Sequence, residues 1–355
     1  MDCADQPGAP RDPRTDRPSP ADRILGSLLA GAVGDALGAP VEFLSRSQIR
    51  ARFGSGGVRE LASAYGRAGA ITDDTQLTLF TAEGLVLAAR AGALDRTDEV
   101  ARIVHRAYLR WLRTQGGTSA HPTFERAGEG WLLDVAGLHA VRAPGATCLA
   151  ALRSARFGRM EQPLNTSKGC GAVMRMAPVG LARAVGDPFR TGCTLAALTH
   201  GHPSGWLAAG FLAAVVRELA AGAPLEAAAR ETLVELRRWP GSEECAGAVD
   251  RALALAGAGP ASTEAVESLG EGWVAEEALA ISLYCALTAP DLESALRLAV
   301  NHGGDSDSTG AITGNLLGAL QGERAIPRRW LDALELRAEI ERMAEELHAA
   351  CGRCE

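Results

Sequence analysis

Several features are scarce in this 355-residue chain, and each scarcity argues against a class of protein. Aromatic residues make up only 5%, and runs in which Val, Ile or Thr alternate with polar residues are nearly absent. Both observations disfavour a fold built on sheets. Basic residues are outnumbered, 36 Lys and Arg against 43 Asp and Glu, which gives a net charge of −7. This deficit disfavours a general nucleic-acid binder, because phosphate backbones are bound by clustered Lys and Arg.

Long apolar runs are also missing. A run such as residues 206–216 is too short to cross a bilayer and is followed by charge. The first twenty residues alternate Pro, Asp and Arg and contain no apolar signal core. We therefore expect residues 1–20 to form a disordered tail, and we expect a cytoplasmic protein with no membrane segment.

The eight cysteines are scattered along the chain, which does not resemble a disulfide framework. Cys351 and Cys354 have C-x-x-C spacing, but no second pair accompanies them, which argues against a zinc or redox site there.

Ala and Leu dominate the remaining residues, and their spacing predicts helices through most of the chain. Pro203 and Pro327 stand where a first helical residue would. The expected helices span residues 22–37, 74–91, 98–114, 188–198, 203–221, 225–238, 242–256, 275–286, 291–300, 310–320 and 327–350. We expect one all-α domain over residues 21–355, with the irregular residues 116–149 as a loop over a site.

Two short acidic clusters lie near opposite ends of the chain, Thr72-Asp73-Asp74-Thr75 and Asp305-Ser306-Asp307-Ser308-Thr309. Each is followed by an apolar helical run, and Thr72 could cap its helix with both aspartates in the first turn. Adjacent carboxylates repel unless a cation or solvent separates them. We therefore predict one site in which both clusters surround one or two hard divalent ions. The alternative is that these residues only cap helices.

Further loops add polar groups. Gly31, Gly34 and Gly38 repeat at helical spacing and would permit close helix packing. Asp35 lies among them and would need a partner if buried. Glu42 follows on irregular backbone.

Gly169 and Gly171 allow a turn whose N–H groups converge on an anion, although such a pair is more often a plain turn. The sequence is neither a Walker A loop nor a Rossmann fingerprint. His200 and His202 lack a third zinc ligand, so hydrogen bonding to a substrate or a carbonyl is favoured.

Taken in order, these segments resemble the ADP-ribosylglycohydrolase family. The specific part is the pairing of TDDT at residues 72–75 with GGDSDS at residues 303–308. GDALGAPVE at residues 34–42 and SKGCGAVMR at residues 167–175 add to it. The resemblance covers nearly everything after the tail. It implies a compact single-domain, all-α, orthogonal helical bundle with two divalent cations, Mg²⁺ or Mn²⁺.

The resemblance also implies roles for individual residues. The metal ligands would be Thr72, Asp73, Asp74, Asp305, Asp307 and Ser308, the last standing where many relatives have Thr. The loop for diphosphate and ribose would include Ser167, Gly169, Cys170 and Gly171, although relatives often carry Asn at position 170. His200 is expected to bind substrate, and Glu42 falls on an acidic residue that approaches the substrate in some members. Asp74, Glu42 and Asp307 are the candidate catalytic carboxylates.

Membership would make the chain a metal-dependent hydrolase that acts on ADP-ribosylated protein and releases ADP-ribose. Arginine is the expected linkage, because the whole motif set resembles the bacterial arginine-specific branch; no single residue selects a guanidinium. Serine, nucleic-acid base and phosphate adducts stay open, as does a non-catalytic ADP-ribose-binding or structural relative. The presence of all four metal aspartates favours catalysis.

Overall fold

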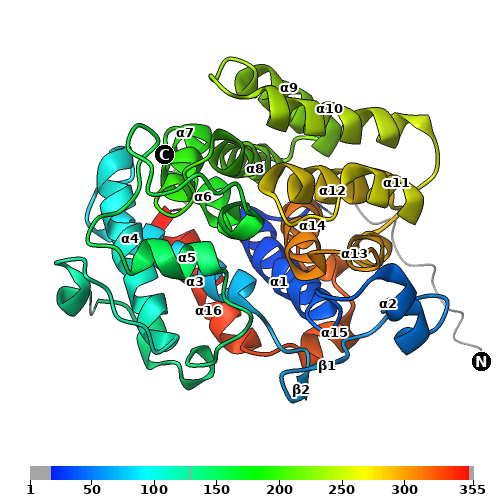
Figure 1. Ribbon diagram of the computed structural model, residues 1–355, viewed down its shortest axis with the longest axis horizontal. Helices are drawn as coiled ribbons and strands as arrows, with labels where there is room; N and C mark the ends of the chain where they lie inside the picture. Colours follow the sequence, from blue (N-terminus) through cyan, green and yellow to red (C-terminus); the bar gives the residue numbers. More distant parts are fainter. Residues whose placement is uncertain (1–16, 128, 352–355) are drawn as a thin grey trace, which may run out of the picture.

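The computed structural model describes residues 17–127 and 129–351. Helices dominate it (Figure 1), and the sheet is a single antiparallel hairpin of β1 (Ser63–Ala64) and β2 (Arg67–Ala68) within those residues. The α-helices are α1 (Pro20–Gly38), α2 (Arg46–Phe53), α3 (Asp73–Arg90), α4 (Thr97–Thr114), α5 (Ala146–Leu152), α6 (Ala177–Leu181), α7 (Pro188–Ala197), α8 (Pro203–Ala221), α9 (Leu225–Leu236), α10 (Glu243–Ala258), α11 (Thr263–Leu269), α12 (Ala275–Thr288), α13 (Leu292–Val300), α14 (Ser306–Gln321), α15 (Arg328–Ala333) and α16 (Arg337–Cys351). Five short 3₁₀ segments are η1 (Phe124–Arg126), η2 (Leu132–Asp134), η3 (Ala136–Leu138), η4 (Cys170–Arg175) and η5 (Glu323–Ala325).

The glycines of α1 pack against the glycines of α14, as their spacing predicts. A Cβ atom on Gly34 would lie 2.0 Å from the carbonyl oxygen of Gly310, and one on Gly314 would lie 2.0 Å from that of Ala30. The two backbones therefore touch without intervening side chains. At the end of this seam Gly38 lies against Ser306, which places the turn after α1 beside the first turn of α14.

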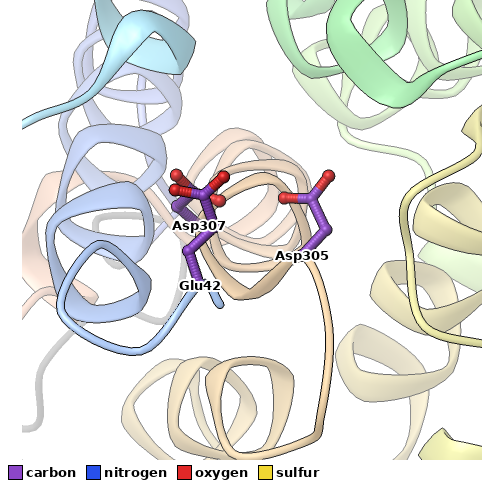
Figure 2. A group of neighbouring side chains, drawn as sticks. All are labelled: Glu42, Asp305 and Asp307. Atoms are coloured by element: carbon purple, nitrogen blue, oxygen red, sulfur yellow. The ribbon is translucent and has the colours of Figure 1, made fainter. Parts of the chain in front are cut away.

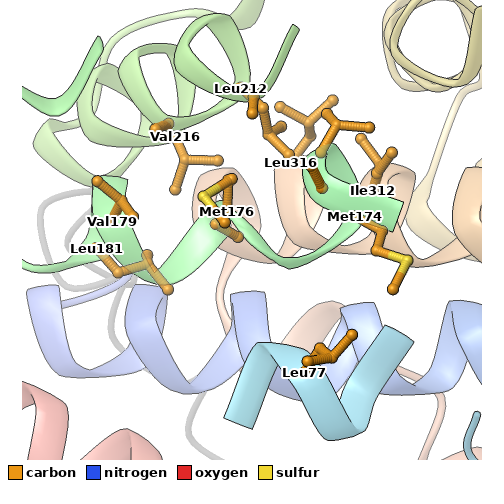
Figure 3. Packing of buried hydrophobic residues seen from close by; sticks show 14 of the residues in the cluster. Leu77, Met174, Met176, Val179, Leu181, Leu212, Val216, Ile312 and Leu316 are labelled. Carbon is orange, nitrogen blue, oxygen red and sulfur yellow. The ribbon is translucent and has the colours of Figure 1, made fainter. Parts of the chain in front are cut away.

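The hydrophobic core is one contiguous cluster, so the described chain forms a single domain. Figure 3 shows its centre, where Met174, Met176 and Val179 lie between α8 and the helices α1, α3 and α14. These side chains are buried, which fixes the segment that follows Gly171 in the chain.

Helix α8 is longer than the apolar run seen in the sequence. By length and composition it alone, among the described residues, could cross a membrane, with a mean hydropathy of 1.3. However, 83% of that stretch is buried inside the protein, as in a core helix. We therefore assign α8 to the hydrophobic core.

Two expected helices differ from the structure. The single helix over residues 327–350 is wrong: α15 ends at Ala333 and α16 begins at Arg337, and Leu336 between them has a left-handed φ of 55°. Helix α14 begins four residues before the expected Gly310, because Asp305 caps it and draws the acidic cluster into its first turn. The short helices α2, α5, α6 and α11 were not expected.

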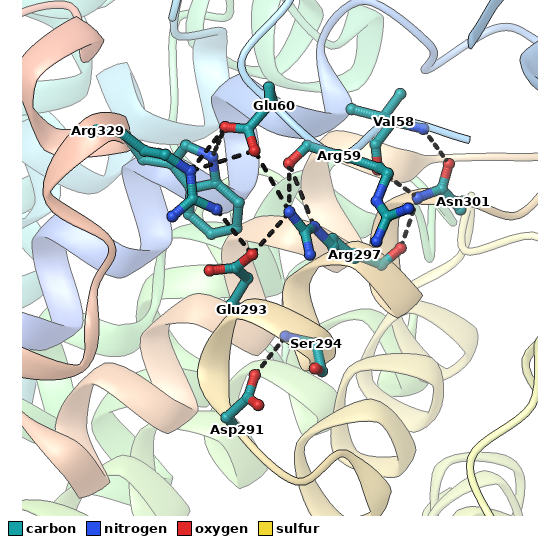
Figure 4. A network of polar contacts seen from close by, with 10 residues as sticks. Val58, Arg59, Glu60, Asp291, Glu293, Ser294, Arg297, Asn301 and Arg329 are labelled. Carbon is teal, nitrogen blue, oxygen red and sulfur yellow. Dashed lines mark hydrogen bonds and ion pairs between the residues drawn. The ribbon is translucent and has the colours of Figure 1, made fainter. Parts of the chain in front are cut away.

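A polar network holds the segment that leads to the hairpin (Figure 4). Both backbone groups of Val58 bond to the side chain of Asn301, and Arg329 bridges Glu60 and Glu293. Exposed ion pairs of this kind contribute little stability individually, so we assign them an orienting role.

The expected tail, residues 1–20, lies largely outside the described residues, and α1 begins at Pro20 with Ser19 as its cap. The six described cysteines are free thiols, as expected, and Cys354 of the C-x-x-C pair falls outside the described residues.

Candidate active site

The first acidic cluster forms the N-terminus of α3. Thr72 is the cap, its hydroxyl accepting from the Asp74 N–H at 3.3 Å, and Asp73 and Asp74 occupy the first turn. This is the arrangement that the sequence predicted. Because Thr72 supplies the cap, the Asp74 carboxylate is not consumed in capping.

Asp35 supports this helix end from α1, a role that the sequence did not reveal. Its buried carboxylate accepts from the backbone N–H groups of Thr72 and Thr75 at 3.0–3.1 Å and from the Thr75 hydroxyl at 2.5 Å. Burial, and then the charge of Asp307, raise the pKa of Asp35 to about 7. Asp35 thus ties α3 to α1 while standing behind the site.

The second cluster forms the N-terminus of α14. Asp305 caps it by accepting from the Ser308 N–H at 3.3 Å, and its own N–H donates to the Glu271 carbonyl at 2.8 Å. The Asp307 carboxylate accepts from the Ser308 N–H at 2.9 Å. Glu42 approaches from the turn after α1, and oxygens of Glu42, Asp305 and Asp307 all lie within 4.8 Å of one another (Figure 2).

Both clusters line one cavity of about 320 Å³. The predicted residues at its wall are Glu42, Asp73, Asp74, Gly169, Cys170, Gly171, His200, Asp305, Asp307 and Ser308. Two predicted residues, Thr72 and Ser167, stand behind the wall. Ser167 supports the glycine turn by accepting from the Gly169 N–H at 3.3 Å. A second cavity of about 330 Å³ beside α4 and α7 contains none of the predicted residues.

The carboxylates of the cavity are nearly inaccessible to water. Burial is the main cause that raises the pKa of Glu42 to about 10, with Asp307 next, and burial likewise raises the pKa of Asp73, Asp74 and Asp305. Such a set cannot be fully ionised together unless positive charge is supplied.

Two buried oxygens of the cluster have no hydrogen-bond partner within the described residues: Glu42 Oε2 and Asp74 Oδ1. Buried polar atoms are normally paired, so these two oxygens are available to coordinate a cation or to bond to a ligand. Carboxylates with nearby hydroxyls are the donors that hard divalent ions prefer. The acidic cluster could therefore hold a metal ion, and its donor set fits one.

Two N–H groups of the glycine turn are engaged within the protein. The Gly169 N–H is occupied by Ser167, and the Cys170 N–H donates to the Trp273 carbonyl at 3.1 Å. The glycines also serve close approach: a Cβ atom on Gly171 would lie 3.2 Å from Cys148 Sγ and 3.4 Å from His200. The Cys170 thiol donates to Asp305, which joins this turn to the acidic cluster.

His200 is buried at the cavity wall, with Nδ1 2.8 Å from the Thr199 hydroxyl. Burial, and then Arg175, lower the pKa of His200 to about 3, so the ring is neutral. His202 is not a metal partner for it, because His202 caps α8 through its own Nδ1. The structure thus supports the expectation that these histidines are hydrogen-bonding groups.

Residues 142–148, part of the expected loop, cover one side of the cavity. The Arg142 carbonyl accepts from the Asp73 N–H, and the Gly145 N–H donates to Asp73 Oδ2, both at 3.1 Å. One Asp73 oxygen is thereby engaged with the loop.

Phe43 and Trp273 also line the cavity, and their rings are stacked with centroids 5.7 Å apart. No local pattern in the sequence marks this pair, because isolated aromatic residues carry no periodicity.

Comparisons with known proteins agree with this geometry. A family model described as ADP-ribosylglycohydrolase matches residues 16–355. The ADP-ribosyl-[dinitrogen reductase] glycohydrolase of Rhodospirillum rubrum is 30% identical over 94% of this chain and 98% of its own length. The ADP-ribosylarginine hydrolase Tri1 of Serratia proteamaculans is 26% identical over 92% of this chain and 79% of its own length.

A solved structure, titled ADP-ribosylglycohydrolase-related protein complex, superposes with a TM-score of 0.65. It is 30% identical and covers 94% of this chain and 99% of its own. The all-α fold, the family match and the converging acidic motifs give one conclusion: this chain belongs to the ADP-ribosylglycohydrolase family.

Proposed function

We propose that this chain is a metal-dependent hydrolase that removes ADP-ribose from modified protein side chains, with arginine as the preferred linkage. The observation that carries the proposal is the meeting of carboxylates from three separate segments in one cavity, where Glu42 Oε2 and Asp74 Oδ1 have no partner among residues 17–127 and 129–351. The names of two relatives, one acting on ADP-ribosyl-dinitrogen reductase and one on ADP-ribosylarginine, support the substrate class.

The two clusters would hold two divalent cations, Mg²⁺ or Mn²⁺, through Asp73, Asp74, Asp305, Asp307 and Ser308 at the cavity wall. Thr72, the sixth expected ligand, does not line the cavity, and its hydroxyl bonds to Asp74. Such ions, when bound, would lower the pKa of a water molecule and orient the diol of a ribose. Asp74 brings an oxygen without a hydrogen bond, whereas Asp73 Oδ2 already accepts from Gly145. Asp305 brings carboxylate oxygens from the cap of α14.

The reaction is a glycoside cleavage, with oxocarbenium character at the distal ribose carbon. The water oxygen bonds to this carbon as the bond to the side-chain nitrogen breaks. A carboxylate, Glu42 or Asp74, accepts the water proton, and a proton passes to the departing nitrogen. The neutral His200, Gly169, Cys170 and Gly171 border the cavity where the rest of ADP-ribose would lie, and fixed contacts there orient the reacting carbon.

The deciding experiment is an ADP-ribose release assay on arginine-linked, serine-linked and DNA-linked substrates, with Mg²⁺, with Mn²⁺ and without either. We expect release from the arginine adduct in the presence of metal. Faster release from the serine adduct would overturn the arginine assignment and leave the hydrolase intact. Binding of ADP-ribose without release from any adduct would instead identify a non-catalytic relative.

A further inference from the structure

Exposed large hydrophobic side chains are few, and most of them surround one opening. Among the described residues five are more than a third exposed: Phe43, Tyr65, Val141, Val234 and Trp273. Phe43 and Trp273 line the mouth of the acidic cavity, with exposed fractions of 71% and 37%. Val141 lies just before the lining residues 143–148, and Tyr65 contacts Arg142 of the same loop, whereas α9, which carries Val234, contributes no lining residue.

Val141 belongs to the loop that covers the cavity. The carbonyl before it, that of Ala140, accepts from the Gln76 side chain at 3.0 Å, and the Arg142 carbonyl after it accepts from the Asp73 N–H. Both bonds hold this loop against the first turns of α3. Val141 is 63% exposed and therefore faces outward beside the opening.

Tyr65 stands at the tip of the β1–β2 hairpin, with a left-handed φ of 50°. The Arg142 guanidinium lies 4.8 Å above its ring and pairs with Glu335, which also accepts from the Ile71 N–H. The hairpin tip and the covering loop are thus joined through Arg142. Phe43, Tyr65, Val141 and Trp273 together form what we call the collar.

Contacts within the protein hold the collar residues in place before a partner binds. Trp273 is fixed by its carbonyl contact with Cys170 and by the neighbouring Gly272 N–H, which donates to Glu277. Gln76, which holds the loop of Val141, also accepts from the Trp111 indole at 3.0 Å. Prearranged side chains lose little conformational entropy on association, and aromatic groups contribute most to binding energy at interfaces.

We propose that the collar is the surface on which the polypeptide bearing the ADP-ribosyl group docks. This inference rests on the proposed function. A cavity of about 320 Å³ has room for part of the ADP-ribosyl group but not for the protein to which it is attached, so that protein must lie against the mouth. Exposed apolar patches beside a polar site mark protein contacts.

Charge complementarity favours a modified polypeptide at the collar over a second copy of this chain and over an anionic lipid surface. The guanidinium that links ADP-ribose to the partner is cationic, and Glu42 precedes Phe43 at the mouth, above a cluster of buried carboxylates. A second copy of the chain would bring the same acidic opening face to face with itself. An anionic lipid surface would meet a chain of net charge −7.

The test compares two substrates: a protein mono-ADP-ribosylated on arginine, and free ADP-ribosyl-arginine. Tyr65→Ser and Val141→Ser change collar residues that do not line the cavity. We expect each to lower kcat/KM on the modified protein about tenfold, mainly through KM, as for a moderate interface residue. Hydrolysis of free ADP-ribosyl-arginine should stay within about twofold.

Val234→Ser is the matched control, since it removes a valine that is also more than half exposed, from α9, and should change neither rate. Equal losses on both substrates would overturn the docking role. An unchanged helical spectrum of the variants would then assign the collar to ADP-ribose binding, and a weakened one would assign it to folding. Unchanged rates on the modified protein would also overturn it. A dimer of the parent that the variants dissolve, seen by size-exclusion chromatography, would assign the collar to a second copy. Hydrolysis of neither substrate by the parent contradicts the proposed function itself, and the docking proposal with it.

Discussion

The two acidic halves of the site are both helix N-termini, but they use their polar groups differently. At α3 a hydroxyl, that of Thr72, caps the helix, and Asp74 Oδ1 has no hydrogen-bond partner in the part of the chain that the structure describes. At α14 the cap is the Asp305 carboxylate itself, which also accepts from the Cys170 thiol. The α14 half therefore uses more of its carboxylate oxygens in hydrogen bonds within the protein, whereas the α3 half keeps an Asp74 oxygen available to a ligand. The comparison teaches that similar acidic motifs can play unequal parts in one site.

The largest effect should come from removing one carboxylate in each half. Asp74→Asn and Asp307→Asn should each lower the rate of hydrolysis by more than roughly 10–100-fold. That range is typical of losing a residue that only hydrogen-bonds to a metal ligand. An amide is a poorer ligand for a hard cation. Release of ADP-ribose measures the loss, and an unchanged helical spectrum shows that the fold persists. Activity within a few-fold of the parent in either variant would break the idea that both halves serve one site.

Chelation should remove activity and lower the melting temperature, and Mg²⁺ or Mn²⁺ should restore both. An ion at a hundredfold excess over its Kd stabilises the fold by about 2.7 kcal/mol. The effect follows from the buried carboxylates, which repel one another when no cation is present. Thermal unfolding with and without each metal measures it. A larger stabilisation by Zn²⁺ than by either ion would contradict an all-oxygen site.

Glu42→Gln tests the third segment, which belongs to neither half. We expect hydrolysis of the arginine adduct to fall about a hundredfold, at the low end of general-base contributions, and the serine adduct to be affected less. The charge of Glu42 would pair with a guanidinium but not with a neutral serine ether. Specificity constants on matched adducts give the answer, and an equal fall on both would remove Glu42 from substrate selection.

The smallest expected effect is a pH dependence of the metal-free protein. The pKa of Asp35 is raised to about 7 in the fold, from an ordinary value near 3.8. The folded form then binds more protons than the unfolded form between these values, so stability should fall as pH rises from about 4 to about 7. Bound cation should flatten this slope. Melting curves at several pH values, before and after chelation, measure it; a metal-free slope of the opposite sign would show that the carboxylates are already compensated.

Local signals in the sequence predicted much of the fold. Pro203 and the left-handed Gly222 bound α8, and both ends of that helix were predicted correctly. The break at Leu336 carried no Gly or Pro to mark it, so α15 and α16 were read as one helix. The start of α14 was missed because Ser306–Thr309 is polar, although Asp305 is a suitable cap.

The sequence predicted the site residues that belong to a local motif, but not the contacts between residues far apart in the chain. The cap at Thr72 and the acidic first turn of α3 were predicted from TDDT, whereas GGDSDS was predicted to precede its helix rather than to begin it. The support from Asp35 depends on how α1 meets α3, which no local pattern encodes. The same holds for the Cys170 N–H, since its partner, the Trp273 carbonyl, lies about a hundred residues away.

The glycine seam between α1 and α14 has a consequence for how this site can vary. Because the backbones touch directly, the spacing between Glu42 and the start of α14 is set by main-chain atoms. Changes of side-chain size elsewhere in the core should therefore have little effect on that spacing. Helix α3, by contrast, packs through side chains and can shift by fractions of an ångström when its neighbours change. Substitutions that accumulate in the core should therefore change the distance between the two halves by moving α3, while the start of α14 keeps its position relative to Glu42.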